Sequence, residues 1–211
     1  MIVQRGEFAN YLRKNSGVKG DATSSEIQGA CSAKLEQCEW PINRVMAKAM
    51  PVYLVEQVTS EHFFEHLDAE TEARAFLLEC LRCLQSQDVL CLVMPDAGTY
   101  LRAYSGPWEV LAEMRPLARI ADGWRDNRLG WIYQTKMQFI NAIFRQRAKH
   151  KYAYDPETLV LILRQAGFVD VVVQQLGVSI DPKMAPDSDD RRTERLYVES
   201  MKREGELLHR I

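Results

Sequence analysis

The chain has 211 residues, a formal net charge of −2, 46% hydrophobic residues and 27% charged residues. This length suffices for one domain with a full core, and the composition is that of an ordinary soluble globular protein. The small net charge gives no bulk attraction toward nucleic acid or anionic lipid. No apolar run approaches the roughly 20 residues that span a bilayer. We therefore expect neither a nucleic-acid nor a membrane partner.

The first 51 residues show the weakest secondary-structure pattern in the chain. Phe8, Tyr11 and Leu12 indicate one side of a short helix that ends before Gly17, and no other element is assigned there. Charged residues such as Arg5 interrupt any secretory apolar core. The five cysteines are an odd number, which favours reduced thiols. Together these features predict a cytoplasmic protein, or one of another reducing intracellular compartment.

A strand, a helix and a second strand are expected between residues 52 and 96. Val52–Val58 predicts the first strand, and Asp68 is a candidate N-cap for the helix that follows. Val89–Met94 is a run of six apolar residues, which suits a parallel strand covered on both faces. Asp96 would then stand at its carboxyl end, where open α/β sheets bind ligands. The helix shows apolar or small residues at helical spacing, namely Ala73, Phe76, Leu77, Cys80, Leu81 and Leu84.

The next stretch, from residue 97 to about 150, is expected to be irregular with one helix. Glycines and prolines break Ala97–Gly130 into short pieces, and a loop this long usually covers or lines a site. Trp131–Arg147 predicts a helix with Met137, Ile140 and Phe144 on one face.

The last third of the chain is clearer. Asp155 is a candidate N-cap for a helix that Gly167 closes. Phe168–Leu176 predicts a strand, Ser179–Thr193 a solvated loop and Arg195–Met201 a final strand. This alternation predicts an α/β fold. Its core should bury Phe76, Leu77, Leu81, Leu90, Leu92, Leu159, Leu163 and Val171.

Several segments, in the same order, resemble one enzyme family. They read SEHFFEHL, EARAFLLECLRCL, DVLCLVMPDAGTYLRAY, NAIFR, KYAYDPETLVLILRQAGFVDV, GVSIDP and RLYVESMK. The resemblance is to small bacterial class I S-adenosylmethionine-dependent methyltransferases of the type 11-like group. It implies a Rossmann-like methyltransferase sheet over residues 52–211, with an insertion at about 97–150 and an antiparallel last strand. Residues 1–51 would form a divergent N-terminal segment.

The resemblance implies methyl transfer from S-adenosylmethionine to an oxygen or nitrogen of a small molecule. Glu61 and His62 lie where this fold contacts the cofactor or the reacting methyl, and a histidine there can act as general base. The alternative is that both residues only cap the following helix. By position, we expect Ser60 and Glu61 to bind the cofactor, His62 and Asp96 to be catalytic, and Tyr100, Tyr104, Asn141 and His150 to contact the substrate.

At several of those positions the alternative is a purely structural role. Asp96 suits turn chemistry, and Tyr100 and Tyr104 suit the small core of the insertion. His150 belongs to a basic run that includes Arg145, Arg147, Lys149 and Lys151. Such a run either grips an anion or forms a solvated helix end.

The sequence departs from the family in its first half. The family has a Gly-rich turn near the cofactor and an acidic residue about twenty positions later for the ribose. Gly17–Asp21 holds the only glycine pair in the first fifty residues, and no apolar strand precedes it. The N-terminal half is therefore expected to be truncated or divergent, and S-adenosylmethionine to bind weakly or not at all. The alternative function is a non-catalytic methyltransferase-fold subunit with a structural or assembly role. In that case residues 1–51 or a protein partner would cover the sheet edge.

Two short motifs allow metal chemistry. His62–His66 reads H-x-x-E-H, the inverted zinc-protease pattern, but no third ligand is evident from the sequence, so we predict no metal there. Cys80 and Cys83 form a C-x-x-C inside the expected helix, without a second cysteine pair. Packing is the favoured role of these two thiols, and only Cys80 falls on the apolar stripe.

Overall fold

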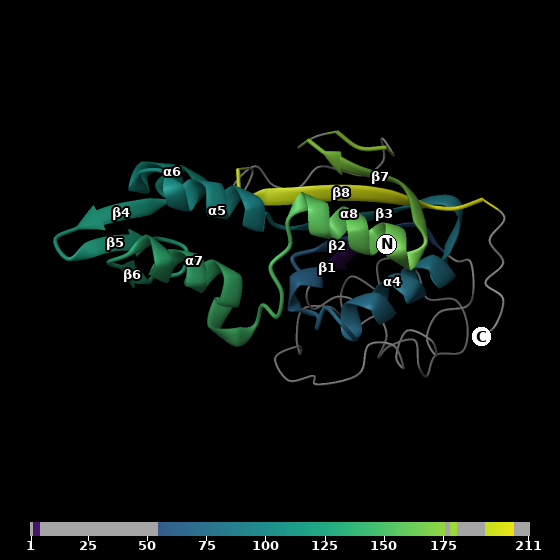
Figure 1. The fold of residues 1–211 in the computed structure, drawn as a ribbon, viewed down its shortest axis with the longest axis horizontal. Coiled ribbons are helices and arrows are strands. Elements are labelled where there is room, and N and C mark those ends of the chain that lie inside the picture. Colours follow the sequence, from purple (N-terminus) through teal and green to yellow (C-terminus); the bar gives the residue numbers. More distant parts are fainter. Residues whose placement is uncertain (1, 5–54, 176–177, 181–192, 205–211) are drawn as a thin grey trace, which may run out of the picture.

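A five-stranded mixed sheet organises the chain. The computed structural model describes residues 2–4, 55–175, 178–180 and 193–204. The strand order is β1-β2-β3-β8-β7, with β1, β2 and β3 parallel and β8 antiparallel to both of its neighbours (Figure 1). The prediction of an antiparallel last strand is thus confirmed. The strands are β1 (Ile2–Gln4), β2 (Val55–Glu61), β3 (Leu84–Pro95), β7 (Phe168–Gln174) and β8 (Arg195–Lys202).

The apolar run Val89–Met94 forms the centre of β3. It pairs with β2 on one side and β8 on the other, and all six residues are buried, as predicted. The strand begins earlier than predicted, at Leu84, directly after the preceding helix. Its first residue pairs with β2, and the Leu84 carbonyl accepts a 2.7 Å hydrogen bond from Lys202 Nζ. These two contacts extend the strand beyond its apolar part.

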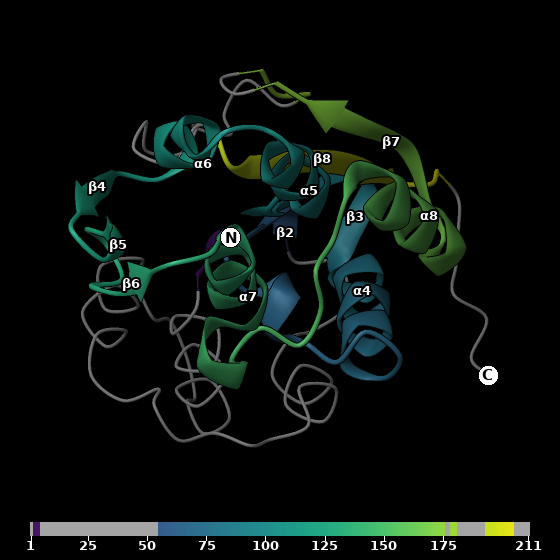
Figure 2. The ribbon, with the colours of Figure 1, turned by 60° about the vertical axis from the view of Figure 1, so that its left-hand side comes forward.

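Two helices pack against each other beside the sheet (Figures 1 and 2). They are α4 (Glu72–Cys83) and α8 (Pro156–Ala166). The predicted ends of α8 are confirmed, since Asp155 accepts a hydrogen bond from the Thr158 amide and Gly167 closes the helix at φ 111°. The core between helices and sheet contains Val58, Phe76, Leu77, Leu81, Leu90, Leu92, Leu159, Leu163, Leu196 and Val198.

Leu81 tests the packing of α4. It is 3% exposed, and its Cδ1 lies 3.4 Å from the point where a Cβ on Gly167 would stand. Because the site is closed, Leu81→Ala should lower the free energy of unfolding by about 2–5 kcal/mol in a urea titration. The matched control Leu161→Ala, at a position 54% exposed, should change it by less than about 0.5 kcal/mol. A loss that small for Leu81→Ala would contradict this helix face.

Two element boundaries differ from the sequence prediction. Strand β2 runs to Glu61 instead of Val58, while residues 52–54 lie outside the described part. Ser60 and Glu61 therefore belong to a strand and not to the loop after it. Helix α4 starts at Glu72 with Thr71 as N-cap, so the assignment of Asp68 as N-cap is wrong. Asp68 instead accepts hydrogen bonds from the amide and hydroxyl of Thr71, which hold the turn before the helix.

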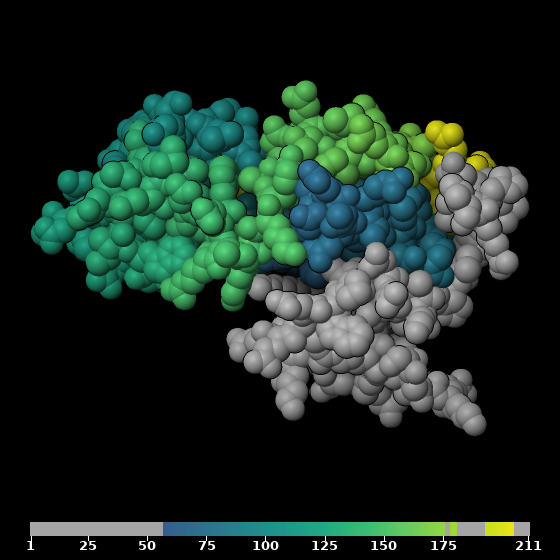
Figure 3. Space-filling model, turned by 60° about the horizontal axis from the view of Figure 1, so that its bottom comes forward, coloured from purple at the N-terminus to yellow at the C-terminus, as the bar shows by residue number. Residues whose placement is uncertain are grey.

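The insertion forms a lobe at one end of the sheet (Figures 1 and 3). It is built from short pieces, as its glycines and prolines predicted. They are α5 (Ala97–Ser105), α6 (Trp108–Met114), β4 (Leu117–Ile120), β5 (Gly123–Asp126), β6 (Ile132–Tyr133), α7 (Lys136–Arg145) and η2 (Gln146–Ala148). Its own core contains Tyr100, Ala103, Leu111, Met114, Tyr133, Phe139, Ile140, Ala142 and Ile143.

The helix predicted at Trp131–Arg147 is shorter in the structure. Ile132 and Tyr133 form a strand, and Thr135 starts α7 through a capping box with Gln138. The predicted face is also wrong in part, because Met137 is 48% exposed whereas Ile140 is buried.

The core prediction holds at all but one position. Val171 is only partly buried, because a register shift between Val169 and Val172 and a positive φ of 49° at Asp170 turn the strand locally. The other seven predicted core residues are buried. The short helix expected near Tyr11 and most of the expected loop at 179–193 fall outside the described residues.

The described cysteines pack in the core. Cys80, Cys83 and Cys91 are free and buried. The burial of Cys83 corrects the prediction that only Cys80 lies on the buried face. Burial raises the pKa of the Cys91 thiol to about 12, which keeps it protonated. No helix in the described ranges is long and apolar enough to cross a membrane.

Candidate functional site at the carboxyl ends of β2 and β3

His62 directly follows β2 in an unusual backbone conformation. Its φ is 48°, a left-handed value that is uncommon for a residue with a side chain. Its amide donates a 2.8 Å hydrogen bond to the carbonyl of Val93 in β3. The ends of the two parallel strands are thus joined at His62. A strained backbone at a strand end is a frequent feature of functional sites.

Glu65 stands beside His62 as a buried carboxylate. It lies in the short helix η1 (Phe64–His66), and its side chain is 3% exposed. His62 Nδ1 lies 3.4 Å from Glu65 Oε1, and His150 Nε2 lies 3.9 Å from the same oxygen. Neither carboxylate oxygen, nor His62 Nε2, has a hydrogen-bond partner among the described residues. A carboxylate facing Nδ1 favours the tautomer whose Nε2 accepts a proton.

The segment after η2 is fastened to η1 by main-chain bonds. The amides of Lys151 and Tyr152 donate to the carbonyl of Glu65 at 2.9 and 3.3 Å. His66 Nδ1 donates to the carbonyl of Lys149 at 2.7 Å. The rings of His66 and His150 meet edge to face with their centroids 4.6 Å apart. Burial lowers the pKa of His150 to about 4, against the opposing charge of Glu65, so this imidazole is neutral at pH 7.

The first strand of the site, β2, ends on two polar side chains. Ser60 is fully buried, and its Oγ has no hydrogen-bond partner in the described part of the chain. Glu61 is half-buried, with Oε1 3.5 Å from Arg195 Nη1. Arg195 starts β8 and pairs with Pro95 across the sheet. The carboxylate of Glu61 is therefore held by an ion pair with β8, which lies on the far side of β3.

Asp96 occupies the carboxyl end of β3, as predicted. Its amide donates to the carbonyl of Glu194 at 2.8 Å, and its Oδ2 accepts a hydrogen bond from the hydroxyl of Thr99. Arg102 lies 3.6 Å from the same oxygen. Oδ1 is buried and has no hydrogen-bond partner within the described ranges.

The remaining predicted residues belong to the insertion. Tyr100 is fully buried, and its hydroxyl bonds to Glu194 and Arg115, which is a core position and not a site wall. Tyr104 is 38% exposed, with Lys136 Nζ 5.6 Å from its ring centroid. The structure therefore places Ser60, Glu61, His62 and Asp96 at the carboxyl ends of β2 and β3 and His150 beside Glu65, and leaves Tyr100, Tyr104 and Asn141 in the insertion.

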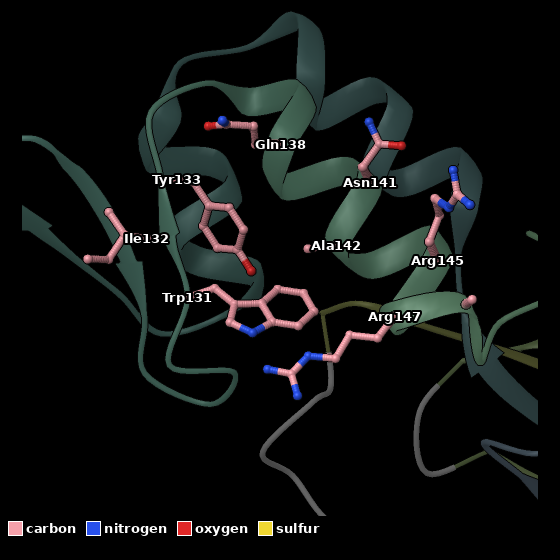
Figure 4. A pocket seen from close by; sticks show the side chains of 9 residues that line it. Trp131, Ile132, Tyr133, Gln138, Asn141, Ala142, Arg145 and Arg147 are labelled. Atoms are coloured by element: carbon pink, nitrogen blue, oxygen red, sulfur yellow. The ribbon is translucent and has the colours of Figure 1, made fainter.

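Asn141 lines an open hollow of about 600 Å³ on the insertion (Figure 4). Its Nδ2 donates to the carbonyl of Met137. Trp131, Tyr133 and Arg147 also line this hollow, and the Arg147 guanidinium lies 4.9 Å from the Trp131 ring centroid.

The basic run from 145 to 151 does not form one patch. Arg147 stacks on Trp131, and Lys151 pairs with Glu72 at 2.9 Å. His150 points to Glu65. The run is thus divided, with Arg145 and Arg147 at the hollow of the insertion and His150 and Lys151 beside acidic residues of η1 and α4.

The sequence prediction missed two residues of this edge. Glu65 was visible in H-x-x-E-H but had no assigned role outside the zinc motif. Arg195 gave no signal, because its approach to Glu61 depends on β8 lying next to β3.

Comparisons with known proteins give distant similarities. No family model and no curated protein matches the chain. Among solved structures, it is similar to a SAM-dependent methyltransferase from Archaeoglobus fulgidus, with 16% identity, a TM-score of 0.43 and coverage of 85% of this chain and 73% of that one. It is also similar to the 1,6-didemethyltoxoflavin-N1-methyltransferase of Burkholderia thailandensis, with 10% identity, a TM-score of 0.38 and coverage of 75% and 48%. The chain thus spans about half the length of the second protein.

Proposed function

We propose that this chain transfers a methyl group from S-adenosylmethionine to an oxygen or nitrogen of a small molecule. The reaction would take place at the carboxyl edge of β2 and β3. Ser60 and Glu61 would hold the cofactor, His62 would act as general base, and Asp96 and His150 would contact the substrate.

One observation carries the proposal. Three buried polar atoms without hydrogen-bond partners among the described residues belong to the ends of these two strands, namely Ser60 Oγ, His62 Nε2 and Asp96 Oδ1. Buried polar groups are nearly always paired, so such a group suggests a missing water, ion or ligand. The carboxyl ends of parallel strands are also where open α/β sheets bind ligands. The sequence resemblance implies cofactor-binding and catalytic residues at this same edge.

The proposed chemistry needs positioning and one proton acceptor. The cofactor supplies an electrophilic methyl group on a sulfonium. His62 Nε2 would take the proton of the attacking hydroxyl or amine, and Glu65, 3.4 Å from Nδ1, would stabilise the imidazolium that forms. Asp96 would orient the nucleophile through its buried oxygen. The half-buried carboxylate of Glu61 fits the polar groups of the cofactor.

We expect the cofactor to bind weakly. The family's Gly-rich turn and its acidic ribose partner are not found in the sequence. Each unpaired buried polar group costs roughly 1–3 kcal/mol, so losing both contacts weakens binding by about two to four orders of magnitude.

A turnover assay tests the proposal. The full chain is incubated with methyl-labelled S-adenosylmethionine, well above micromolar concentration, and a panel of small alcohols, phenols and amines. We expect label in at least one acceptor, with matching formation of S-adenosylhomocysteine. Absence of transfer to every acceptor class would contradict the assignment as an enzyme.

The second candidate function is a non-catalytic methyltransferase-fold subunit. The pairing of β1 favours it, because this strand pairs with only Thr59, Ser60 and Glu61 of β2. In the described part of the chain, β1 is the outermost strand on this side, and a short outer strand leaves room for a partner strand to pair. Light scattering of the purified chain tests this candidate, since a subunit that offers a sheet edge to a partner predicts self-association.

A further inference from the structure

Three of the four histidines of the chain meet around one carboxylate. His62 and His66 flank Glu65 in sequence, and His150 arrives from the segment after the insertion. The fourth histidine, His209, lies outside the described residues. Besides the roles proposed for His62, Glu65 and His150 in methyl transfer, a carboxylate surrounded by imidazoles is a donor set for a metal ion.

Three of these residues have the spacing of a metal site. Glu65, His66 and His150 each offer one ligand atom, and the three atoms lie within 4.8 Å of one another. Ligand atoms around a tetrahedral zinc ion stand about 3.3 Å apart, given bonds of about 2.0–2.2 Å. Small side-chain rotations would therefore close the three atoms onto one ion.

His66 is oriented as metal-ligating histidines usually are. It donates from Nδ1 to the carbonyl of Lys149, so its lone pair is on Nε2. The His150 ring meets the His66 ring edge to face, with the centroids 4.6 Å apart. A ligating histidine typically gives its other ring N–H to a carbonyl or carboxylate, which fixes the tautomer and the ring orientation.

The scaffold beneath the three residues is firm. The amides of Lys151 and Tyr152 both donate to the main-chain carbonyl of Glu65, which joins the segment of His150 to η1. Phe64, next to Glu65, is fully buried against Phe76 and Tyr154. The ligands thus come from two elements that the core and the main chain hold together.

The buried carboxylate of Glu65 would be stabilised by a cation. Its side chain is 3% exposed, and neither oxygen accepts a hydrogen bond from a described residue. A buried charge without such partners is costly, whereas coordination of a cation removes the cost.

We propose that Glu65, His66 and His150 form a binding site for a divalent transition metal ion such as Zn²⁺. Two imidazoles with one carboxylate suit zinc and its neighbours, whereas Mg²⁺ and Ca²⁺ prefer oxygen ligands only. His62 lies next to this site, with Nδ1 3.4 Å from Glu65 Oε1. The ion ties η1 to the segment that returns from the insertion. The sequence predicted no metal because the third ligand, His150, is remote from H-x-x-E-H in the chain.

Metal binding to the full chain tests the site without any cofactor, so its outcome is independent of the proposed methyl transfer. The protein is stripped with a chelator and titrated with Co²⁺, followed by visible absorption, and with Zn²⁺ in competition with a chromophoric chelator. We expect one ion per chain and a rise in the melting temperature on zinc addition. Mg²⁺ should give neither effect.

Variants assign the ligands. Glu65→Gln, His66→Asn and His150→Asn should each weaken zinc binding by more than about 100-fold, since loss of even an outer partner costs about 10–100-fold. His209→Asn is the matched control and should bind like the parent. Circular dichroism of the metal-free variants verifies their fold, and Glu65→Asp, which keeps the charge, should retain part of the affinity.

Three results would overturn the site. They are less than stoichiometric zinc on the parent chain, unchanged affinity in the folded His66→Asn and His150→Asn variants, and equal loss in His209→Asn. Binding of Mg²⁺ as tight as that of Zn²⁺ would also overturn it, because it would show that the imidazoles take no part.

Discussion

Replacement of His62 by glutamine is expected to lower the rate of methyl transfer by about 10²–10⁴-fold, the usual contribution of a general base. Glutamine keeps a polar side chain of similar size but cannot accept the proton at pH 7. The measurement is kcat for the best acceptor in the turnover assay. His62 bonds to β3 through its main-chain amide, which the substitution keeps, and its side chain contacts Glu65. The variant should therefore fold like the parent.

The split between kinetic constants separates this role from a structural one. A general base acts in the transition state, so kcat should fall while the KM for S-adenosylmethionine stays within a few-fold. If His62 only capped the following helix, the melting temperature would fall and kcat per folded molecule would not. An unchanged kcat in a folded His62→Gln protein would remove this residue from the mechanism.

Replacement of Arg115 by methionine is expected to destabilise the fold by about 3–5 kcal/mol, because it removes the nearest cation from the buried carboxylate of Glu194. Arg115 Nε lies 2.6 Å from Glu194 Oε2, with the two side chains 7% and 0% exposed. Tyr100 bonds to both residues, and Arg128 lies 3.3 Å from the other carboxylate oxygen. This network joins the insertion to the start of β8.

Urea titration of the variants measures the effect. The matched control is Arg102→Met. The Arg102 side chain is 71% exposed and lies 3.6 Å from its partner Asp96, so this substitution should lower the free energy of unfolding by less than about 1 kcal/mol. The double variant Arg115→Met/Glu194→Gln should regain part of the stability, since it removes the buried negative charge together with its nearest cation. A loss below about 1 kcal/mol for Arg115→Met would mean that water reaches Glu194.

Local patterns predicted the central elements well. The run Val89–Met94 predicts a buried strand because every position is apolar. The ends of α8 are predicted by Asp155 and Gly167, because aspartate is favoured at the start of a helix and glycine just after its end. Thr135 shows where such reasoning fails. Its capping box with Gln138 ends the strand region and begins α7, yet apolar spacing alone extended the helix back to Trp131.

Contacts between segments that are distant in the chain could not be predicted from the sequence. The ion pair between Glu61 and Arg195 requires β8 to lie beside β3, and the approach of His150 to Glu65 requires the chain to return from the insertion. Neither contact leaves a periodic or spaced pattern. The edge of the site was predictable because Asp96 and His62 each follow a strand, whereas its buried carboxylate, Glu65, emerged only from the structure.

The most direct test of the account is titration calorimetry of the full chain with S-adenosylmethionine. The central claim is that the ends of β2 and β3 hold this cofactor, with Glu61 as a contact. We predict saturable binding that is weaker than low micromolar, lost in Glu61→Gln and retained in Glu109→Gln, an exposed position in α6 of the insertion. No saturable binding to the parent chain, or equal binding to the parent and to Glu61→Gln, would contradict it.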